Sequence, residues 1–195
     1  MEIVHNIKML NIAFSFNIVR ITEYSFDSLR KYLDNALFVK PNVLYVADSN
    51  GNLSPETTEG LLNFLKSYDI PLGCHGHNNL DLAVANSITA IKSAASFIDA
   101  SIAGLGKGTV NLKLESLISY INSLNPGSKY NLCASLEAKM YAENLSYFSK
   151  VTNPTDIIMG HFNLSQAYIN KLDSKWGIQT IFNTAQSLKA YSEII

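Results

Sequence analysis

The sequence is poor in charged residues and in cysteine, and both shortages narrow the classes of protein to consider. Only 16% of the 195 residues are charged, and 15 lysines and arginines nearly balance 16 aspartates and glutamates. No basic block stands out, so neither nucleic acid nor an anionic membrane surface is an expected partner. The two cysteines, Cys74 and Cys133, make no disulfide framework and suit a reducing compartment.

Long apolar runs are also absent. None approaches the ~20 residues that a membrane-spanning helix needs, and the first residues, MEIVHNIKML, do not have the layout of a signal peptide. What the chain does have is 47% hydrophobic residues, enough for one sizeable core. We therefore expect a soluble cytoplasmic domain that binds neither a membrane nor nucleic acid.

Apolar, β-rich stretches alternate with amphipathic ones over the first two thirds of the chain. The expected strands lie in residues 11–20, 42–51, 70–77 and 96–108, the last of which includes the glycine loop that follows its strand. The expected helices lie in 25–38, 54–68, 79–95 and 111–124. Ser54 is the expected N-cap of the second helix, with Pro55 at its first position. This alternation predicts the α/β class, with a parallel sheet covered by helices.

The clearest break in the chain is NPGSKY, residues 125–130. Beyond it the pattern becomes helical, in residues 133–150, 164–175 and 178–192. We therefore divide the chain into four βα units, residues 1–125, and a C-terminal helical region, residues 126–195. A closed parallel barrel needs eight such units, and an open four-stranded sheet would leave two edges to be covered or paired.

Two of the four histidines, His75 and His77, stand two residues apart in LGCHGH. On a strand such residues project from the same face, while Cys74 projects from the other. Parallel α/β folds place ligands at the carboxyl ends of their strands, where these histidines fall. Two imidazoles can share one divalent ion, although two protein ligands alone rarely hold one. The alternative is that both are hydrogen-bonded residues at a strand end, and the spacing does not decide between the two.

Other polar residues also follow expected strands. Asp48, in ADSNG, either forms a turn or serves as an active-site carboxylate, and the usual fate of a residue placed like Arg20 is a surface ion pair. The glycine-rich GLGKGTVN, residues 104–111, matches neither a P-loop nor a dinucleotide motif and indicates a tight turn, where Asn111 could cap the next helix. His161 stands alone, and we expect it to be structural.

Taken in order, three stretches resemble one family: ADSNG, GCHGHNNLDLAVANSITAI and IDASIAGLGKGTVNLKLE. They are similar to the metal-dependent TIM-barrel aldolases and acyltransferases known as DRE-TIM metallolyases. That group includes 4-hydroxy-2-oxovalerate aldolase, hydroxymethylglutaryl-CoA lyase and the isopropylmalate and citramalate synthases. The resemblance is greatest to the hydroxy-oxovalerate aldolase branch and is best over residues 8–115.

The resemblance implies a fold and a site. The fold is a partial TIM (β/α)8 barrel made of strands five to eight, with a C-terminal helical extension. His75 and His77 would be metal ligands, and Asn111 would lie on or near the metal. Asp48 would border the active site as a catalytic residue, and Arg20 is the candidate substrate-binding residue. The implied cofactor is a divalent ion, Mn²⁺ first, with Mg²⁺ or Zn²⁺ as alternatives.

The implied reaction splits a 4-hydroxy-2-oxo acid into pyruvate and an aldehyde, with the metal acting as a Lewis acid. The family's first strand ends in an arginine–aspartate pair that no strand of this sequence supplies, so activity of this chain alone stays open. Asp81, Val110 and Lys113 also stand where the family usually has glycine, glycine and proline.

A half-barrel needs something to complete it. We expect either a second chain that carries the N-terminal half of the barrel or self-association. The alternative functions are a non-catalytic half-barrel, retained as an interaction module or a gene-fragment relic, and an acyltransferase of the isopropylmalate or citramalate synthase type.

Overall fold

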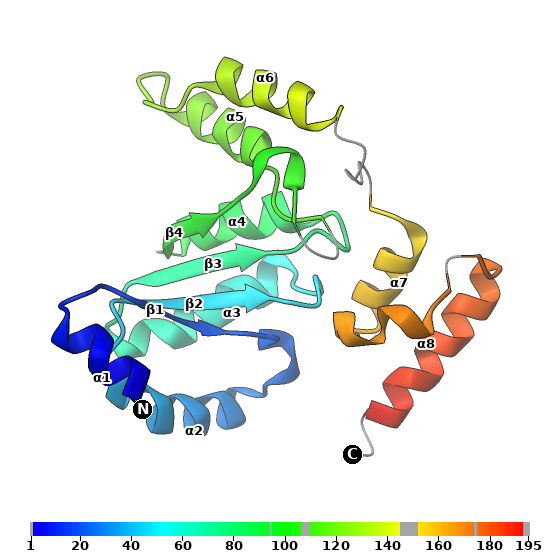
Figure 1. Ribbon diagram of the computed structural model, residues 1–195, viewed down its shortest axis with the longest axis horizontal. Coiled ribbons are helices and arrows are strands. Elements are labelled where there is room, and N and C mark those ends of the chain that lie inside the picture. The colour runs from blue at the N-terminus through cyan, green and yellow to red at the C-terminus, as the bar shows by residue number, and fades with distance from the viewer. Residues whose placement is uncertain (1, 94, 107–109, 145–151, 174, 193–195) are drawn as a thin grey trace.

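The computed structural model describes residues 2–93, 95–106, 110–144, 152–173 and 175–192. These residues build a parallel four-stranded sheet in which spatial order follows chain order (Figure 1). Its strands are β1 (Ser15–Ile18), β2 (Val43–Asp48), β3 (Leu72–Gly76) and β4 (Ala95–Asp99). Because successive right-handed crossovers in one direction keep the connecting helices on one face, this order predicts a sheet with one covered and one open face.

Helices connect the strands and extend beyond them. They are α1 (Glu2–Met9), α2 (Phe26–Ala36), α3 (Pro55–Leu65), α4 (Ala83–Lys92), α5 (Leu114–Leu124), α6 (Leu132–Ala142), α7 (Pro154–His161) and α8 (Ile178–Ser192). Ser54 caps α3 in a capping box with Thr57, and Pro55 opens the helix, as the sequence predicts. No helix in the described part of the chain is long and apolar enough to cross a membrane.

The main core lies between one face of the sheet and three helices. Alternate strand residues contribute to it together with α2, α3 and α4, and its fully buried members include Ile18, Leu44, Val46, Cys74, Leu29, Leu33, Leu62 and Leu65. The residues between them project from the opposite face. There Phe97 is 45% exposed and Asn17 is exposed, so this face is open.

The C-terminal part of the chain has a small core of its own, built from α7, the 3-10 segment Gln166–Lys171 and α8. Figure 1 shows α7 beyond the carboxyl ends of β2 and β3. Asparagines from the loops after these strands hold it there. Asn52 Nδ2 donates to the Gly160 carbonyl at 2.7 Å, and Asn79 Nδ2 donates to the Asp156 carbonyl at 3.1 Å. The helical region is therefore fastened to the same edge of the sheet where the histidines lie.

The expected strands and the helices between them are present. In residues 96–108, expected as the fourth strand and its glycine loop, β4 ends at Asp99 and a turn with positive φ at Ala103 and Gly104 follows. Two details differ from expectation. The expected helix 164–175 is instead the short 3-10 segment, and neither α1 nor α7 is predicted by the sequence. Residues 107–109 of the glycine-rich loop and residues 145–150 of the expected helix 133–150 lie outside the described residues.

Candidate metal centre at the carboxyl end of the sheet

The two histidines lie together at the end of β3, between β2 and β4. LGCHGH is a strand, and its partner residues place Ala47 beside His75 and Asp48 beside Gly76, so both strands end at the same edge. The imidazole centroids are 5.1 Å apart, with the ring planes at 80°. The expectation that these side chains share the open face at the carboxyl end of the sheet is confirmed.

His77 is held by the main chain. Its Nδ1 lies 2.7 Å from the carbonyl oxygen of Asp48. A carbonyl oxygen can only accept, so Nδ1 carries the proton and the Nε2 lone pair of the neutral ring is left for a ligand. Burial lowers the pKa of His77 below its usual range, although the hydrogen bond to the carbonyl opposes this shift. The ring is therefore neutral near pH 7, which is the form that binds a metal.

His75 is held by a carboxylate that the sequence pattern alone does not single out. Its Nδ1 donates to Oδ2 of Asp99 at 3.2 Å, and the strand register places the two residues side by side. The other oxygen of Asp99 accepts from the hydroxyl of Tyr45 at 3.1 Å. One sequence signal could have found Asp99: it is a charged residue at the end of the fourth strand, as the histidines are at the end of the third.

Asn111 lies beside His77, with which it forms an isolated antiparallel bridge. It does not cap α5, which begins at Leu114 after the N-cap position of Lys113. Its Nδ2 donates to the Leu105 carbonyl at 3.2 Å, whereas its buried Oδ1 accepts no hydrogen bond from the described residues. A buried acceptor without a donor costs about 1–3 kcal/mol, which a cation bound to it would offset.

Asp48 has its carboxylate in the turn after β2. Its two oxygens accept from the backbone N–H groups of Asn52 at 3.0 Å and Leu53 at 3.2 Å. Burial raises the pKa of Asp48 to about 6, and the backbone hydrogen bonds oppose that rise. Of the two roles that the sequence allows for Asp48, turn former or active-site carboxylate, this geometry is that of a turn former. The carbonyl of the same residue orients His77. A catalytic role for its carboxylate stays a prediction.

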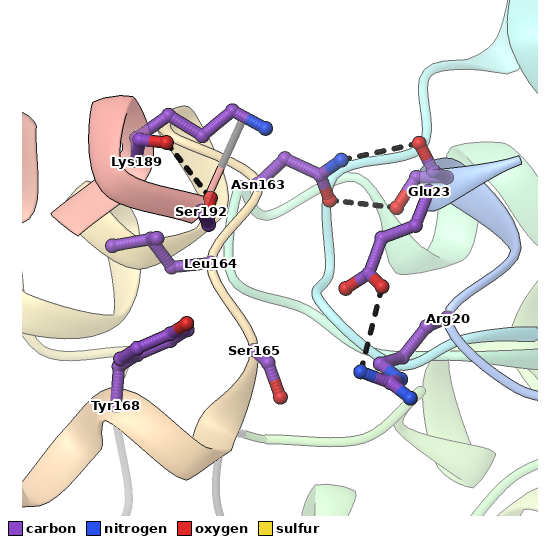
Figure 2. Close-up of a pocket in the computed structure, with 9 residues that line it drawn as sticks. Arg20, Glu23, Asn163, Leu164, Ser165, Tyr168, Lys189 and Ser192 are labelled. Carbon is purple, nitrogen blue, oxygen red and sulfur yellow. Dashed lines mark hydrogen bonds and ion pairs between the residues drawn. The ribbon is translucent and has the colours of Figure 1, made fainter. Parts of the chain in front are cut away.

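Arg20 lies away from the histidines. It has a left-handed backbone (φ 52°), and its guanidinium is 3.5 Å from the carboxylate of Glu23, a surface ion pair. Figure 2 shows this pair at a pocket of about 540 Å³, whose other lining residues are Thr22, Asn163, Leu164, Ser165, Tyr168, Lys189 and Ser192. Neither histidine nor Asn111 lines that pocket. The structure does not bring Arg20 to the candidate metal centre, and its binding of substrate stays a prediction for a separate pocket.

The departures from the family pattern include one that the backbone explains. Asp81, where the family usually has glycine, has φ 57°, a left-handed conformation that favours glycine and that aspartate tolerates better than most residues. Its carboxylate accepts hydrogen bonds from Asn78 Nδ2 at 2.9 Å and Thr152 Oγ1 at 3.1 Å. The loop after the histidines is therefore kept in shape despite the substitution.

The donor set is that of an incomplete site. In the described ranges no three His, Cys, Asp or Glu side chains form a metal-binding group. Two imidazoles and one amide oxygen suit a divalent ion such as Mn²⁺ or Zn²⁺, and a carboxylate from elsewhere would complete the site. The residues present therefore fit a divalent ion.

A parallel sheet covered by helices, with polar side chains gathered at the carboxyl ends of its strands, defines an α/β protein. The family model described as HMGL-like matches residues 1–141, and the chain belongs to the HMGL-like family. It is 39% identical over 101 residues to 4-hydroxy-2-oxovalerate aldolase of Spirochaeta aurantia, a match that covers 51% of this chain and 30% of the relative. It is 29% identical over 141 residues to 4-hydroxy-2-oxovalerate aldolase of Desulfitobacterium hafniense, a match that covers 71% of this chain and 42% of the relative.

Solved structures show the same fold. The N-terminal domain of a proposed aldolase from Bacteroides vulgatus superposes with a TM-score of 0.76 and 28% identity, over 92% of this chain and 60% of that one. An HMG-CoA lyase from Brucella melitensis superposes with a TM-score of 0.64 and 13% identity, over 73% and 55%, and supports the fold alone. The chain spans less than half the length of either curated aldolase.

Proposed function

We propose that this chain carries the imidazole half of the metal centre of a carbon–carbon lyase, which splits 4-hydroxy-2-oxo acids into pyruvate and an aldehyde. The main supporting observation is that His75 and His77 both donate from Nδ1 to protein acceptors, which leaves both Nε2 atoms for one ion. The names of the curated relatives support the reaction class. That name, aldolase, favours this function over an acyltransferase or a non-catalytic module.

In this proposal each residue has a task. His75, His77 and the Oδ1 of Asn111 bind a divalent ion, with Mn²⁺ preferred over Mg²⁺ because imidazole suits the softer ion. An ion held by these residues would supply a Lewis acid for the 2-oxo acid. Asp48 fixes the ring of His77 through its carbonyl, and burial keeps that ring neutral. Asp48 also stays the candidate for a catalytic carboxylate, and Arg20 for a contact with substrate.

The proposed enzyme needs the rest of a barrel. We propose that residues 1–125 are strands five to eight of a TIM barrel, that residues 126–195 are its helical extension, and that four more strands complete it. They would come from a second chain, from the remainder of a longer polypeptide or from a second copy. The open face supports this, and so do the outer edges of β1 and β4, beside which no further strand lies in the part of the chain that the structure describes. Unpaired strand edges invite further pairing. We place the assembled enzyme in the cytoplasm.

Calorimetric titration with Mn²⁺ and Zn²⁺ tests the metal centre. We expect His75→Ala and His77→Ala each to weaken binding at least about tenfold and the double variant to abolish it, because each removes one of few ligands. His161→Gln is the matched control and should bind as the wild type does, since His161 packs against Phe162 and Phe182 in the C-terminal core. Equal affinity of the wild type and the double variant would refute the metal centre.

The lyase itself is tested by pyruvate release from 4-hydroxy-2-oxovalerate, followed with a coupled dehydrogenase. We expect activity once the segment with the arginine–aspartate strand is supplied, and none in the double histidine variant. A reconstituted barrel that binds Mn²⁺ but releases no pyruvate would refute the reaction and leave the metal centre in place.

A further inference from the structure

A tyrosine of β2 reaches across β3 to an aspartate of β4. Tyr45 pairs in register with Gly73, and a Cβ added at Gly73 would lie 2.6 Å from the carbons of the Tyr45 ring. Because Gly73 has no side chain, the Tyr45 ring has room to lie over β3. From there the hydroxyl reaches Oδ1 of Asp99 at 3.1 Å.

The Asp99 carboxylate is thereby held at both oxygens. Oδ1 accepts from Tyr45 and Oδ2 accepts from Nδ1 of His75 at 3.2 Å. The Asp99 side chain is 46% exposed and that of His75 is 33% exposed, so neither is fixed by packing alone. Burial, together with the charge and hydrogen bond of Asp99, raises the pKa of Tyr45 to about 12, so the hydroxyl keeps the proton that it donates.

The strand register brings these groups together. Leu72 pairs with Ala95, but Gly73 pairs with Phe97, so β4 advances by one residue at this point. Without that shift Ile98 would stand opposite His75, and Asp99 would project from the other face. The bulge thus places a carboxylate beside one histidine only. The other, His77, is oriented by a backbone carbonyl, which no side-chain substitution removes.

We propose that Asp99 and Tyr45 are positioning residues for the metal centre, in which Asp99 holds His75 as the Nδ1–H tautomer and Tyr45 holds the carboxylate in place. This rests on the proposed function, because it assigns His75 as a ligand through Nε2. Such outer partners orient a ligating imidazole and raise its basicity, and their loss typically costs about 10–100-fold in metal affinity. Asp99 itself does not contact the ion.

The tautomer of His75 can be read without metal, from the ¹⁵N chemical shifts of the imidazole rings in the full chain. We expect the Nδ1–H form in the wild type, a shift towards the Nε2–H form in Asp99→Ala, and a smaller shift in Tyr45→Phe. His77 should keep its Nδ1–H form in every variant, which provides an internal control. An unchanged His75 tautomer in Asp99→Ala would overturn the proposal.

Metal affinity gives the second measurement, by titration of the same chains with Mn²⁺ and Zn²⁺. We expect Asp99→Ala to bind about 10–100-fold more weakly and Tyr45→Phe to lose less. Asp99→Asn, which keeps an acceptor oxygen, should lie between Asp99→Ala and the wild type and remains informative if the alanine variant does not fold. The charge control is Asp34→Asn, at an exposed position of α2 on the helix-covered side, which should change affinity less than twofold.

The metal centre and the positioning role of Asp99 are refuted by different results. If His75→Ala abolishes binding while Asp99→Ala leaves both affinity and tautomer unchanged, the positioning role is refuted and the metal centre stands. If His75→Ala binds as the wild type does, the metal centre is refuted. A loss of affinity in Asp34→Asn equal to that in Asp99→Ala would also overturn the positioning role, because it would show an effect of net charge.

Discussion

The two faces of the sheet are built from alternate residues of the same strands, and they differ in burial and in polarity. On the helix-covered face Leu44, Val46 and Cys74 are buried in the main core. On the open face Tyr45 and His75 are partly exposed and are linked through Asp99 by hydrogen bonds. Because successive side chains of a strand point to opposite faces, the residues that stabilise the fold lie on one face and those that can bind a ligand lie on the other.

The neighbours Cys74 and His75 show how sharp this separation is. Burial raises the pKa of the Cys74 thiol to about 12, so at neutral pH it is a protonated, apolar core group. The next residue, His75, projects from the open face, and its Nε2 bonds to none of the residues that the structure describes. Substitutions on one face should therefore change stability, and those on the other should change binding.

The largest expected effect is on the covered face. Leu44, with 0% exposure, is central to the core, and Leu44→Ala should lower the free energy of unfolding by about 2–5 kcal/mol. Urea denaturation measures this loss. The folded fraction should bind Mn²⁺ with wild-type affinity, because Leu44 projects away from the histidines. A loss below about 1 kcal/mol would show that this face does not dominate stability.

An intermediate effect is expected where the C-terminal region meets the sheet. Asn163 has φ 51°, and its Oδ1 accepts from Thr22 Oγ1 at 2.6 Å and from Asn50 Nδ2 at 2.8 Å. Its Nδ2 also donates to the Thr22 carbonyl at 3.2 Å. Asn163→Ala should cost about 2–4 kcal/mol, from three lost hydrogen bonds and left-handed strain. Hydrogen exchange should locate the loss of protection in α7 and α8.

Asn163→Gly separates these two contributions, because glycine adopts the left-handed conformation without strain. It should lose about 1 kcal/mol less than the alanine variant. If the glycine variant is as unstable as the alanine variant, the left-handed backbone contributes nothing and hydrogen bonding alone explains the effect.

The smallest effect is expected on the open face. Phe97 is 45% exposed, so Phe97→Ala should change the free energy of unfolding by less than about 1 kcal/mol. Phe16 on β1, which packs against the main core, is the matched control. Phe16→Ala should cost at least about 1 kcal/mol more in the same denaturation measurement. Equal losses would mean that the two faces contribute alike.

Much of the fold can be predicted from residues that lie close together in the sequence. The alternation of apolar strands and amphipathic helices predicts the parallel sheet, Ser54 and Pro55 predict the start of α3, and the expected helix 178–192 coincides with α8. Such features depend on neighbours a few residues apart, so one sequence suffices to find them. The shared face of His75 and His77 follows in the same way from their spacing.

The tertiary structure alone decided what surrounds those histidines. Asp99 meets His75 only because β4 has one extra residue beside Gly73, and this shift is defined by how two separate strands pair. Asn111 reaches His77 through a loop, and α7 is held by asparagines more than 70 residues away in the chain. Hydrogen bonds between distant residues depend on how strands and loops come together in space, whereas sequence periodicity records only which way each side chain points.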